Sequence, residues 1–337
     1  MAPITAKCTC LASSARLQRS SHTVSVIANN AWIFGGELHP RQPVDNQFDV
    51  VELSKASAAV QTIPAQGEAP TPRVGSASTV LGDAIYFFSG RGGMAMAPIE
   101  ENGQLWSYKP STSQWSLVSP ADVAAPYPAA RSYHAMTNNG NSTIYVHAGC
   151  PESGRLSDLW SFDVNTRTWK SLADAPNPPR GGTSIAYCAG KLYRMNGFDG
   201  KQEQGGNLDV YDPSQDSWSV VPYPADGKNG PEARSVSALL PLQLDGKPFL
   251  VTLFGERDPS SLGHAGAGKM LGDVWAYDVE LGIWSKVEAS GELPPPRGWF
   301  DADVVADVEM KDAIVVHGGL AEDNSRLGDV WIIELDA

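Results

Sequence analysis

A carboxylate and an imidazole lie close together in a glycine-rich segment of this sequence. Glu256 and His264 fall in the stretch 256–270, which reads ERDPSSLGHAGAGKM. Such a pair can act as general acid and base, or both groups can bind a divalent cation. The spacing alone favours a plainer alternative, a solvated Glu and a His that bonds to its own loop. The chemical interpretation therefore depends on which other side chains the fold brings to the same place.

Six copies of one pattern run along the chain and predict its elements. Each copy has an Arg, a short apolar strand, a second strand ending at a Gly, a third strand related to Asp-Leu-Trp or Asp-Val-Trp, and a fourth strand. The copies begin roughly every 50 to 60 residues, a period typical of propeller blades. The opening arginines are Arg19, Arg73, Arg131, Arg180, Arg234 and Arg297. The fourth strands carry large apolar residues, namely Val60, Trp115, Trp169, Trp218 and Trp284.

The order of strands in such a repeat decides which residues meet. In a four-stranded meander, the loops between strands two and three emerge on the same face as the connections between consecutive sheets. The residues directly after the second-strand glycine therefore surround one mouth of a central channel: Glu37, Arg91, Cys150, Phe198, Glu256 and Leu320. The residues two positions after each opening Arg surround the same mouth: Ser21, Gly75, Tyr133, Gly182, Val236 and Trp299.

This mouth is the predicted site for a small polar or anionic metabolite, because a few convergent polar groups in an apolar hollow are typical of ligand pockets. We expect Arg91 to anchor an anionic or carbonyl oxygen, and Glu256 and His264 to transfer protons or hold a metal. Trp299 is a bulky indole outside the blade positions, and we expect it to complete the catalytic set. The expected substrate-binding residues are Glu37, Tyr133, Phe198 and Leu320.

The composition excludes several classes of partner. The 337 residues carry 25 Lys+Arg against 38 Asp+Glu, a net charge of −13, whereas binding to nucleic acid or to an anionic membrane requires a basic surface. No apolar run reaches the roughly 18 residues that cross a bilayer. The four cysteines are too few for a disulfide scaffold and form no CxxC pair, so we expect a cytoplasmic protein. No motif for a nucleotide or an organic cofactor stands out.

Together these features resemble the Kelch repeat over residues 1–337, which we take as a single domain. The resemblance implies an all-β, six-bladed Kelch β-propeller with four antiparallel strands in each blade. The sixth repeat ends with Trp331-Ile332-Ile333-Glu334-Leu335 and lacks a fourth strand. Residues 5–11 belong to no other blade, so we expect this N-terminal strand to complete the last blade and close the ring.

Within this family the sequence is similar to the plant specifier proteins and to their non-plant Kelch relatives. The plant proteins divert unstable glucosinolate aglycones to nitriles, epithionitriles or thiocyanates with the help of ferrous iron. The shared motifs are Ser89-Gly90-Arg91, Pro296-Arg297-Gly298-Trp299 and the run Gly-His-Ala-Gly-Ala-Gly at 263–268. The resemblance implies a pocket of the same kind, and it leaves the substrate open.

The resemblance also implies a divalent metal, Fe(II) or another ion, as the cofactor. In the plant proteins the ligands are a Glu, an Asp and a His at intervals of four residues. Here Glu256 and His264 match the outer positions, Ser260 replaces the Asp, and Asp258 is the nearest carboxylate. His39, in the same loop as Glu37, is a candidate second ligand.

Two functions remain open at this point. The first is an enzyme, a specifier-like lyase, isomerase or cyclase, which promotes a non-redox rearrangement, elimination or cyclisation of a reactive metabolite. The second is a Kelch protein–protein interaction module without catalytic activity. That module would expose an apolar patch on a loop face and would associate with a protein partner or weakly with a second copy of itself.

Overall fold

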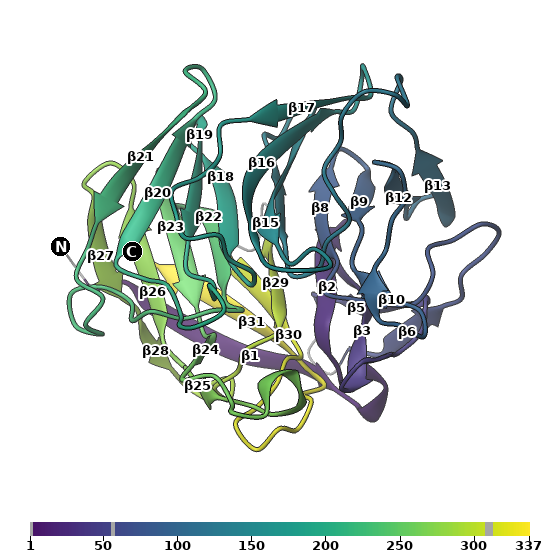
Figure 1. The fold of residues 1–337 in the computed structure, drawn as a ribbon. Helices are drawn as coiled ribbons and strands as arrows, with labels where there is room; N and C mark the ends of the chain where they lie inside the picture. Colours follow the sequence, from purple (N-terminus) through teal and green to yellow (C-terminus); the bar gives the residue numbers. More distant parts are fainter. Residues whose placement is uncertain (1–2, 55–57, 307–312) are drawn as a thin grey trace.

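The computed structural model describes residues 3–54, 58–306 and 313–337, and its regular structure is almost entirely β-strand. The two helical segments are single 3₁₀ turns, η1 (Ala15–Leu17) and η2 (Gly263–Ala265). None of the helices in these ranges has the length and apolar character needed to span a bilayer. Figure 1 shows the strands gathered into sheets that stand around a common centre.

Six sheets of four or five strands contain most of the chain. The first sheet has β2 (Ser20–Ile27), β3 (Asn30–His39), β5 (Phe48–Glu52) and β6 (Val60–Ile63). The second has β8 (Ala77–Leu81), β9 (Ala84–Phe88), β12 (Leu105–Lys109) and β13 (Gln114–Val118). The third has β14 (Ala135–Asn138), β15 (Thr143–Gly149), β16 (Leu156–Asp163) and β17 (Thr168–Leu172).

The remaining sheets follow the same order. The fourth has β18 (Ser184–Cys188), β19 (Lys191–Met195), β20 (Asn207–Asp212) and β21 (Ser217–Pro222). The fifth has β22 (Ala238–Leu244), β23 (Lys247–Leu253), β26 (Val274–Asp278) and β27 (Ile283–Lys286). The sixth has β29 (Asp301–Val305), β30 (Ala313–His317), β31 (Asp329–Asp336), β1 (Thr5–Ser13) and β28 (Glu288–Ser290). Short strands in the loops are β4 (Gln42–Pro43), β7 (Arg73–Val74), β10 (Arg91–Gly92), β11 (Ala97–Pro98), β24 (Glu256–Arg257) and β25 (Lys269–Met270).

The six residues two positions after the opening arginines form a cycle of backbone hydrogen bonds. Their φ angles lie between +46° and +61°, in the left-handed region. Each amide donates to the carbonyl of its counterpart in another sheet: Ser21 to Trp299 (2.8 Å), Gly75 to Ser21 (2.8 Å), Tyr133 to Gly75 (2.7 Å), Gly182 to Tyr133 (2.8 Å), Val236 to Gly182 (2.9 Å) and Trp299 to Val236 (3.1 Å). We call this cycle the inner ring. It fixes the side chains of Tyr133 and Trp299 around one centre.

The opening arginines are buried structural residues. Each one donates through Nη1 to the carbonyl oxygen of the residue before the second-strand glycine; for Arg131 this acceptor is Ala148, at 3.0 Å. Five also pair with a carboxylate of their own repeat, as Arg297 does with Asp329 at 2.7 Å. In turn Asp329 accepts the indole N–H of Trp331. The Asp-Val-Trp motif is therefore the partner of the opening Arg.

A glycine is required at the end of the second strand because the next backbone approaches closely. At Gly149 φ is +98°, and a Cβ there would lie 2.7 Å from the Cβ of His134. Such contacts are too short for any side chain, which explains the recurring glycine of the repeat.

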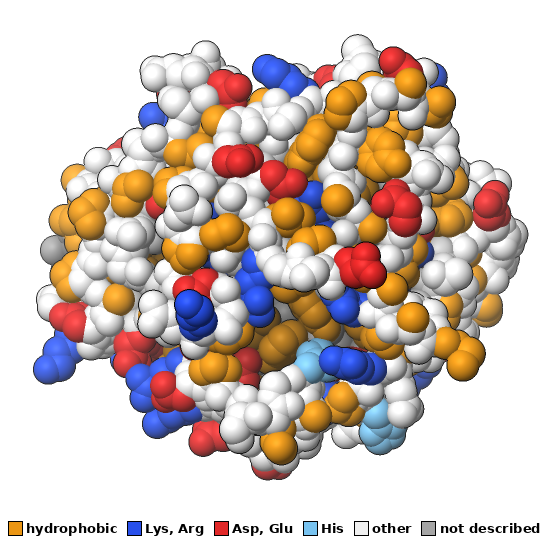
Figure 2. All heavy atoms as spheres, in the orientation of Figure 1, with side chains coloured by type: hydrophobic (Ala, Val, Ile, Leu, Met, Phe, Trp, Pro, Cys, Tyr) orange, Lys and Arg blue, Asp and Glu red, His pale blue; other side chains and the backbone are white. Residues whose placement is uncertain are grey.

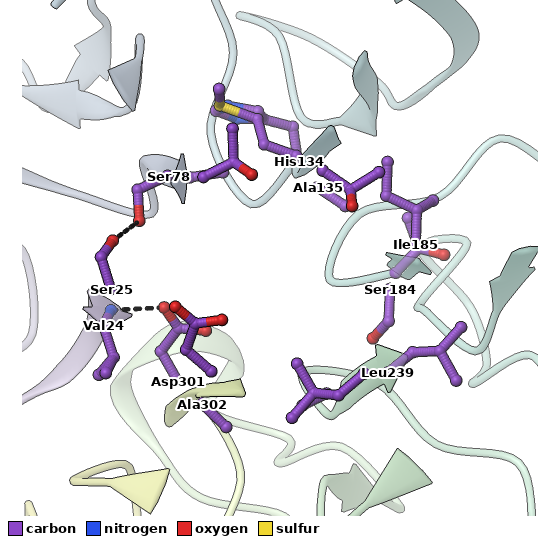
Figure 3. Close-up of a pocket in the computed structure, with 18 of the residues that line it drawn as sticks. Val24, Ser25, Ser78, His134, Ala135, Ser184, Ile185, Leu239, Asp301 and Ala302 are labelled. Carbon is purple, nitrogen blue, oxygen red and sulfur yellow. Dashed lines mark hydrogen bonds between the residues drawn. The ribbon is translucent and has the colours of Figure 1, made fainter. Parts of the chain in front are cut away.

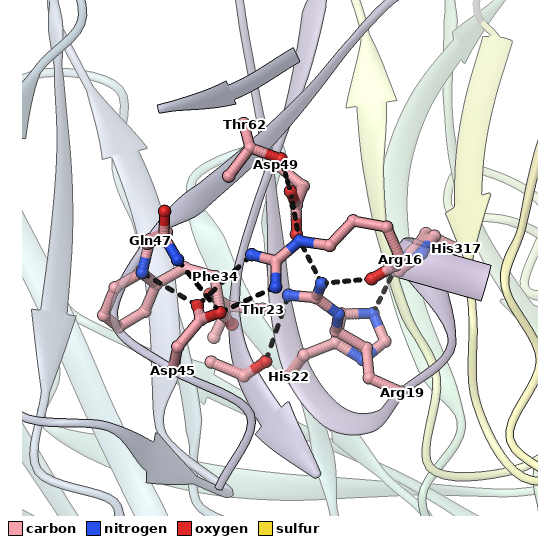
Figure 4. A network of polar contacts seen from close by, with 11 residues as sticks. Arg16, Arg19, His22, Thr23, Phe34, Asp45, Gln47, Asp49, Thr62 and His317 are labelled. Carbon is pink, nitrogen blue, oxygen red and sulfur yellow. Dashed lines mark hydrogen bonds and ion pairs between the residues drawn. The ribbon is translucent and has the colours of Figure 1, made fainter. Parts of the chain in front are cut away.

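The N-terminal strand β1 pairs antiparallel with β31, from Thr5 opposite Asp336 to Ser13 opposite Asp329. This is the place predicted for residues 5–11. One strand is unexpected: β28 pairs parallel with β1 and covers Thr5–Lys7. After β1, Arg16 reaches the first sheet and binds both Asp45 (2.7 Å) and Asp49 (2.8 Å), as Figure 4 shows. The N-terminal segment thus contacts both the last and the first sheet.

Candidate functional site

The floor of the predicted mouth consists of two aromatic side chains of the inner ring. Tyr133 lies two residues before β14 of the third sheet and Trp299 two residues before β29 of the sixth, yet their rings meet edge to face with centroids 5.3 Å apart. The ring of Tyr133 lies against Gly75, where a Cβ would be 2.7 Å from its Cε1. Because the neighbouring positions 75 and 182 are glycines, the two large rings can reach across the centre and cover it.

Above this floor lies a cavity of about 320 Å³. Four loops line it with the residues that follow the second-strand glycines in sheets two to five: Arg91, Cys150, Phe198 and Glu256. Figure 2 shows the face as a hollow where basic and hydrophobic side chains meet, with a histidine at its edge. The prediction that these loops and the inner ring share one mouth agrees with this lining.

Glu256 is held by two N–H donors on opposite sides. Its Oε1 accepts the backbone N–H of Gly268 at 2.5 Å, and its Oε2 accepts the indole N–H of Trp299 at 2.9 Å. The side chain is buried, and burial raises the pKa of Glu256, against the lowering effect of these two donors and of nearby His264. Glu256 therefore ties the end of its own loop to the inner ring.

His264 bonds to a different carboxylate from the one predicted. Its Nε2 lies 2.9 Å from Oε1 of Glu37, which is 1% exposed. Glu37 also accepts the backbone N–H of Arg41 at 2.6 Å and lies 3.5 Å from Nη2 of Arg326. The imidazole contacts the rings of Trp299 and Tyr133, with centroids 5.5 and 6.0 Å apart. Glu37 thus fixes His264 against the aromatic floor.

Three arginines line the cavity, Arg41, Arg91 and Arg155, and none of their guanidinium groups forms an ion pair with a carboxylate of the described residues. Arg91 donates to three neutral oxygens: Ser132 Oγ (3.1 Å), Met96 O (3.2 Å) and Pro151 O (3.3 Å). Arg155 lies over the ring of Phe198 at 5.0 Å from its centroid. Arg91 therefore has no carboxylate to balance its charge, and Arg155 acts on Asp199 only through space, so an anionic ligand group is favoured here.

Glu203 also lines the cavity, and the sequence reasoning missed it. It belongs to the fourth of the loops between second and third strands, between β19 and β20, and Ser235 Oγ donates to its Oε1 at 3.4 Å. Burial raises the pKa of Glu203 to about 7; its own backbone N–H lowers the pKa, and the charge of Glu256 raises it. A survey of every charged residue in the loops around the mouth would have found Glu203 and Arg155.

The described residues do not fit the implied metal ion. No group of three or more His, Cys, Asp or Glu side chains in this part of the chain is placed to hold one. Asp258 is not among the residues that line the cavity; 76% of its side chain is exposed, and it lies 3.6 Å from Arg257. Ser260 accepts the backbone N–H of Leu262, Glu256 is bonded to N–H donors, and His264 to Glu37. The Glu-Asp-His arrangement of the plant proteins is absent from these contacts.

The predicted residues thus divide into two groups. The cavity is lined by six of them: Arg91, Glu256, His264, Trp299, Tyr133 and Phe198. Glu37 lies behind His264 and does not line it. Leu320 is 4% exposed, bridges to Gly298 and is not among the residues that line the cavity. His39 is exposed at the end of β3, outside the lining.

A second chamber of about 550 Å³ lies beyond the inner ring and shares Tyr133, Gly182, Val236 and Trp299 with the first. Figure 3 shows its wall, where Asp301 approaches Val24. Asp301 accepts the backbone N–H of Val24 at 2.6 Å, and Asp303 that of Val26 at 2.7 Å. Burial raises the pKa of Asp301 to about 7 and that of Asp303 to about 6. These two carboxylates join the sixth sheet to the first.

Comparison with known proteins identifies the class of this protein. The chain matches the KLHDC2/KLHL20/DRC7 Kelch-repeats domain over residues 21–247, more than half of its length, and it therefore belongs to the Kelch-repeat family. The solved structure of YjhT aligns with a TM-score of 0.70 at 14% identity, over 96% of this chain and 99% of YjhT. The chain is thus an all-β Kelch propeller, as predicted.

Its similarity to characterised proteins is more particular. It is 27% identical to N-(sulfonatooxy)prop-2-enimidothioate sulfolyase of Thlaspi arvense, over 95% of this chain and 93% of that protein. This similarity confirms the resemblance to the plant specifier proteins. The chain is also 22% identical to the leucine-zipper-like transcriptional regulator 1 homolog of Drosophila melanogaster and 28% identical to tip elongation aberrant protein 1 of Schizosaccharomyces pombe. It spans 31% and 16% of those two proteins, respectively.

Proposed function

We propose that this protein is a lyase-like enzyme that binds a small anionic metabolite in the mouth cavity and promotes its non-redox elimination, rearrangement or cyclisation. The scaffold in this proposal is one domain, a closed ring of six blades completed by β1. The observation that carries the proposal is that one cavity contains both free guanidinium groups and two carboxyls, Glu203 and Glu256. The similarity to a sulfolyase supports the same reaction class. The four free cysteines support a cytoplasmic location.

The contacts of the lining residues indicate a role for each of them. Arg91 is aimed into the cavity by its three neutral acceptors and binds the anionic oxygen that carries charge in the leaving group. Phe198 and Trp299 hold the apolar part of the metabolite. Tyr133 closes the floor, so the reacting atoms are kept from the water of the second chamber. Elimination of an oxyanion such as sulfate needs stabilisation of the leaving charge, which these cations supply.

The test uses N-(sulfonatooxy)prop-2-enimidothioate, the compound in the name of the similar plant enzyme, with products separated by chromatography and identified by mass spectrometry. We expect the wild-type protein to change the product distribution relative to a protein-free sample. Arg91→Ala should lower this effect roughly 100-fold, the cost of a lost charge-assisted contact. Arg167→Ala, at an exposed position in the β16–β17 turn, is the matched control. Equal products with and without wild-type protein would reject this substrate, and full activity of Arg91→Ala would reject the site.

One observation favours the alternative of an interaction module. Three loops around the mouth expose large apolar side chains: Leu38 (40%), Met94 (106%) and Leu262 (72%). A second copy of the chain is the partner that this alternative predicts. Sedimentation velocity from about 1 to 100 μM would then show association, and replacement of these three residues by Ser would abolish it. A monomer across that range would exclude self-association through these loops.

A further inference from the structure

We propose that Glu203 is the residue of the mouth cavity that acts as a neutral carboxyl and donates a hydrogen bond to the leaving oxygen, and that Glu256 and His264 are positioning residues. This inference rests on the proposed function, because it assigns a role within that reaction. It differs from the expectation from sequence, which gave the proton to Glu256 and His264. The reason lies in what each of the three side chains already contacts.

Glu256 is occupied as an acceptor on both oxygens. Gly268 N–H and Trp299 Nε1–H donate to it at 2.5 and 2.9 Å. Each bond needs an oxygen that accepts a hydrogen bond, and both oxygens of an ionised carboxylate are acceptors. A proton placed on either oxygen would oppose one of these donors inside a buried site. Glu256 therefore stays a carboxylate through the reaction and holds the 256–270 loop on the inner ring.

His264 is engaged at one of its two ring nitrogens. Its Nε2 lies 2.9 Å from the buried Glu37, which has further N–H donors from Arg41 and Arg326. Proton transfer at Nε2 would break the contact that sets the imidazole against Trp299 and Tyr133. His264 thus shapes the cavity wall as a member of a fixed pair.

Glu203 is the carboxyl in the lining that is held more weakly. It accepts a long hydrogen bond from Ser235 Oγ, 3.4 Å, and an interaction with its own backbone N–H, and it lines the same cavity as Arg91 and Arg155. Its neighbour Glu256 is the fixed negative charge that favours a neutral Glu203. A carboxyl in this setting can hold its proton near neutral pH and donate a hydrogen bond to a bound oxyanion.

In the proposed step a bond from a substrate atom to oxygen breaks, and both electrons leave with the oxygen, whose charge Arg91 stabilises. The neutral carboxyl of Glu203 donates a hydrogen bond to that oxygen as its charge develops and keeps its proton, because a sulfate ion is a much weaker base than a carboxylate. A lone pair on a neighbouring substrate atom forms the new multiple bond to the atom that loses the oxygen. Glu203 is unchanged at the end of the step, and no oxidant or reductant is consumed.

The first experiment compares Glu203→Gln, Glu256→Gln and the control Glu280→Gln, an exposed residue in the β26–β27 turn, with N-(sulfonatooxy)prop-2-enimidothioate. We expect Glu203→Gln to lower kcat roughly 100-fold with little change in KM, and to remove the loss of rate that wild type shows as pH rises through about 7. Glu256→Gln should keep that pH limb, because the residue that titrates is still present. A wild-type pH profile in Glu203→Gln would overturn the assignment.

The second experiment does not depend on turnover. Inorganic sulfate is titrated into each protein at pH 7 in buffers of different ionisation enthalpy, which measures the protons taken up on binding. Wild type and Glu256→Gln should take up a fraction of one proton per sulfate, and Glu203→Gln should take up none. Uptake by Glu203→Gln equal to that of wild type would overturn the role of Glu203 and leave the proposed function standing. Failure of wild type both to bind sulfate and to act on the compound would overturn both.

Discussion

At the scale of single residues, the environment of Trp299 shows how one side chain serves two purposes. Its ring meets Tyr133 across the centre, and its Nε1–H binds the buried carboxylate of Glu256. The indoles of the fourth strands have simpler contacts: Trp169 donates to the carbonyl oxygen of Gly103 at 2.7 Å. Because a carboxylate left without a donor in a buried site costs more than a neutral carbonyl, the two positions should respond differently to the same substitution.

We therefore expect Trp299→Phe to destabilise the protein by about 2–3 kcal/mol and Trp169→Phe by about 1 kcal/mol, from the difference between charged and neutral hydrogen bonds. Urea unfolding at pH 7 measures both. Hydrogen exchange should also be faster at Gly268 in Trp299→Phe, since Glu256 is then held from one side. Equal losses for the two variants would show that the bond to Glu256 contributes nothing beyond an ordinary hydrogen bond.

At the scale of elements, side chains of β29 in the sixth sheet bind the backbone of β2 in the first sheet. Asp301 and Asp303 on β29 accept the backbone N–H groups of Val24 and Val26 on β2. The pKa of each carboxyl is raised from 3.8, to about 7 and about 6, because burial disfavours the charged form. The native state therefore holds protons between about pH 4 and 7 that the unfolded chain has released.

This difference predicts how stability changes with pH. The stabilisation from the protonated Asp301 and Asp303 is complete below about pH 4 and is lost as pH rises through 6 to 7. The free energy of unfolding should therefore fall between about pH 4 and 7. Asn at both positions can still accept the two N–H groups and removes the titration. We expect the wild type to lose on the order of 1–2 kcal/mol between pH 5 and 8 relative to the Asp301→Asn/Asp303→Asn variant; the open chamber limits the effect. Parallel stability curves for the two proteins would contradict this account.

At the scale of the whole molecule, the first and last segments of the chain depend on one another. β1 supplies buried side chains to the sixth sheet, among them Ala6, Cys8 and Leu11, which are between 3% and 8% exposed. β31 would otherwise present Trp331 and Ile333 at an open edge. Burial of several such side chains is worth about 1.5–3 kcal/mol each for the large ones, which is comparable with the total stability of a domain.

Deletion of residues 1–15 should therefore remove the cooperative unfolding transition or lower Tm by more than about 10 °C. Lys7→Ala is the control, since Lys7 is 74% exposed on its side chain and its pair with Glu334 at 3.9 Å contributes little. Differential scanning calorimetry measures both proteins. A synthetic peptide of residues 1–15, added in excess, should restore the transition. Unchanged Tm in the truncated protein would refute the proposed closure of the ring by β1.

Much of this fold could be predicted from the sequence, because the repeat carries local information in every copy. Each motif has a recurring structural role. The opening Arg bonds to a backbone carbonyl and to the Asp of the Asp-Val-Trp motif, as Arg297 does with Asp329, and the second-strand Gly leaves room for a neighbouring backbone, as Gly319 does. Strand order then places Arg91, Glu256 and Trp299 at one mouth without any coordinates. β28 was not predicted, since three exposed residues have no pattern of their own.

The partners of the charged groups were decided by tertiary structure alone. His264 lies eight positions after Glu256 (264 − 256) in sequence but bonds to Glu37, from a loop more than two hundred residues away along the chain. Glu203 becomes an acid near neutral pH because of the burial and the neighbouring Glu256 that the fold provides. Local spacing determines backbone geometry, since the hydrogen bonds within a repeat join residues that are close together in the sequence. Charges interact through space, so their pairing and their pKa values exist only once the sheets have assembled.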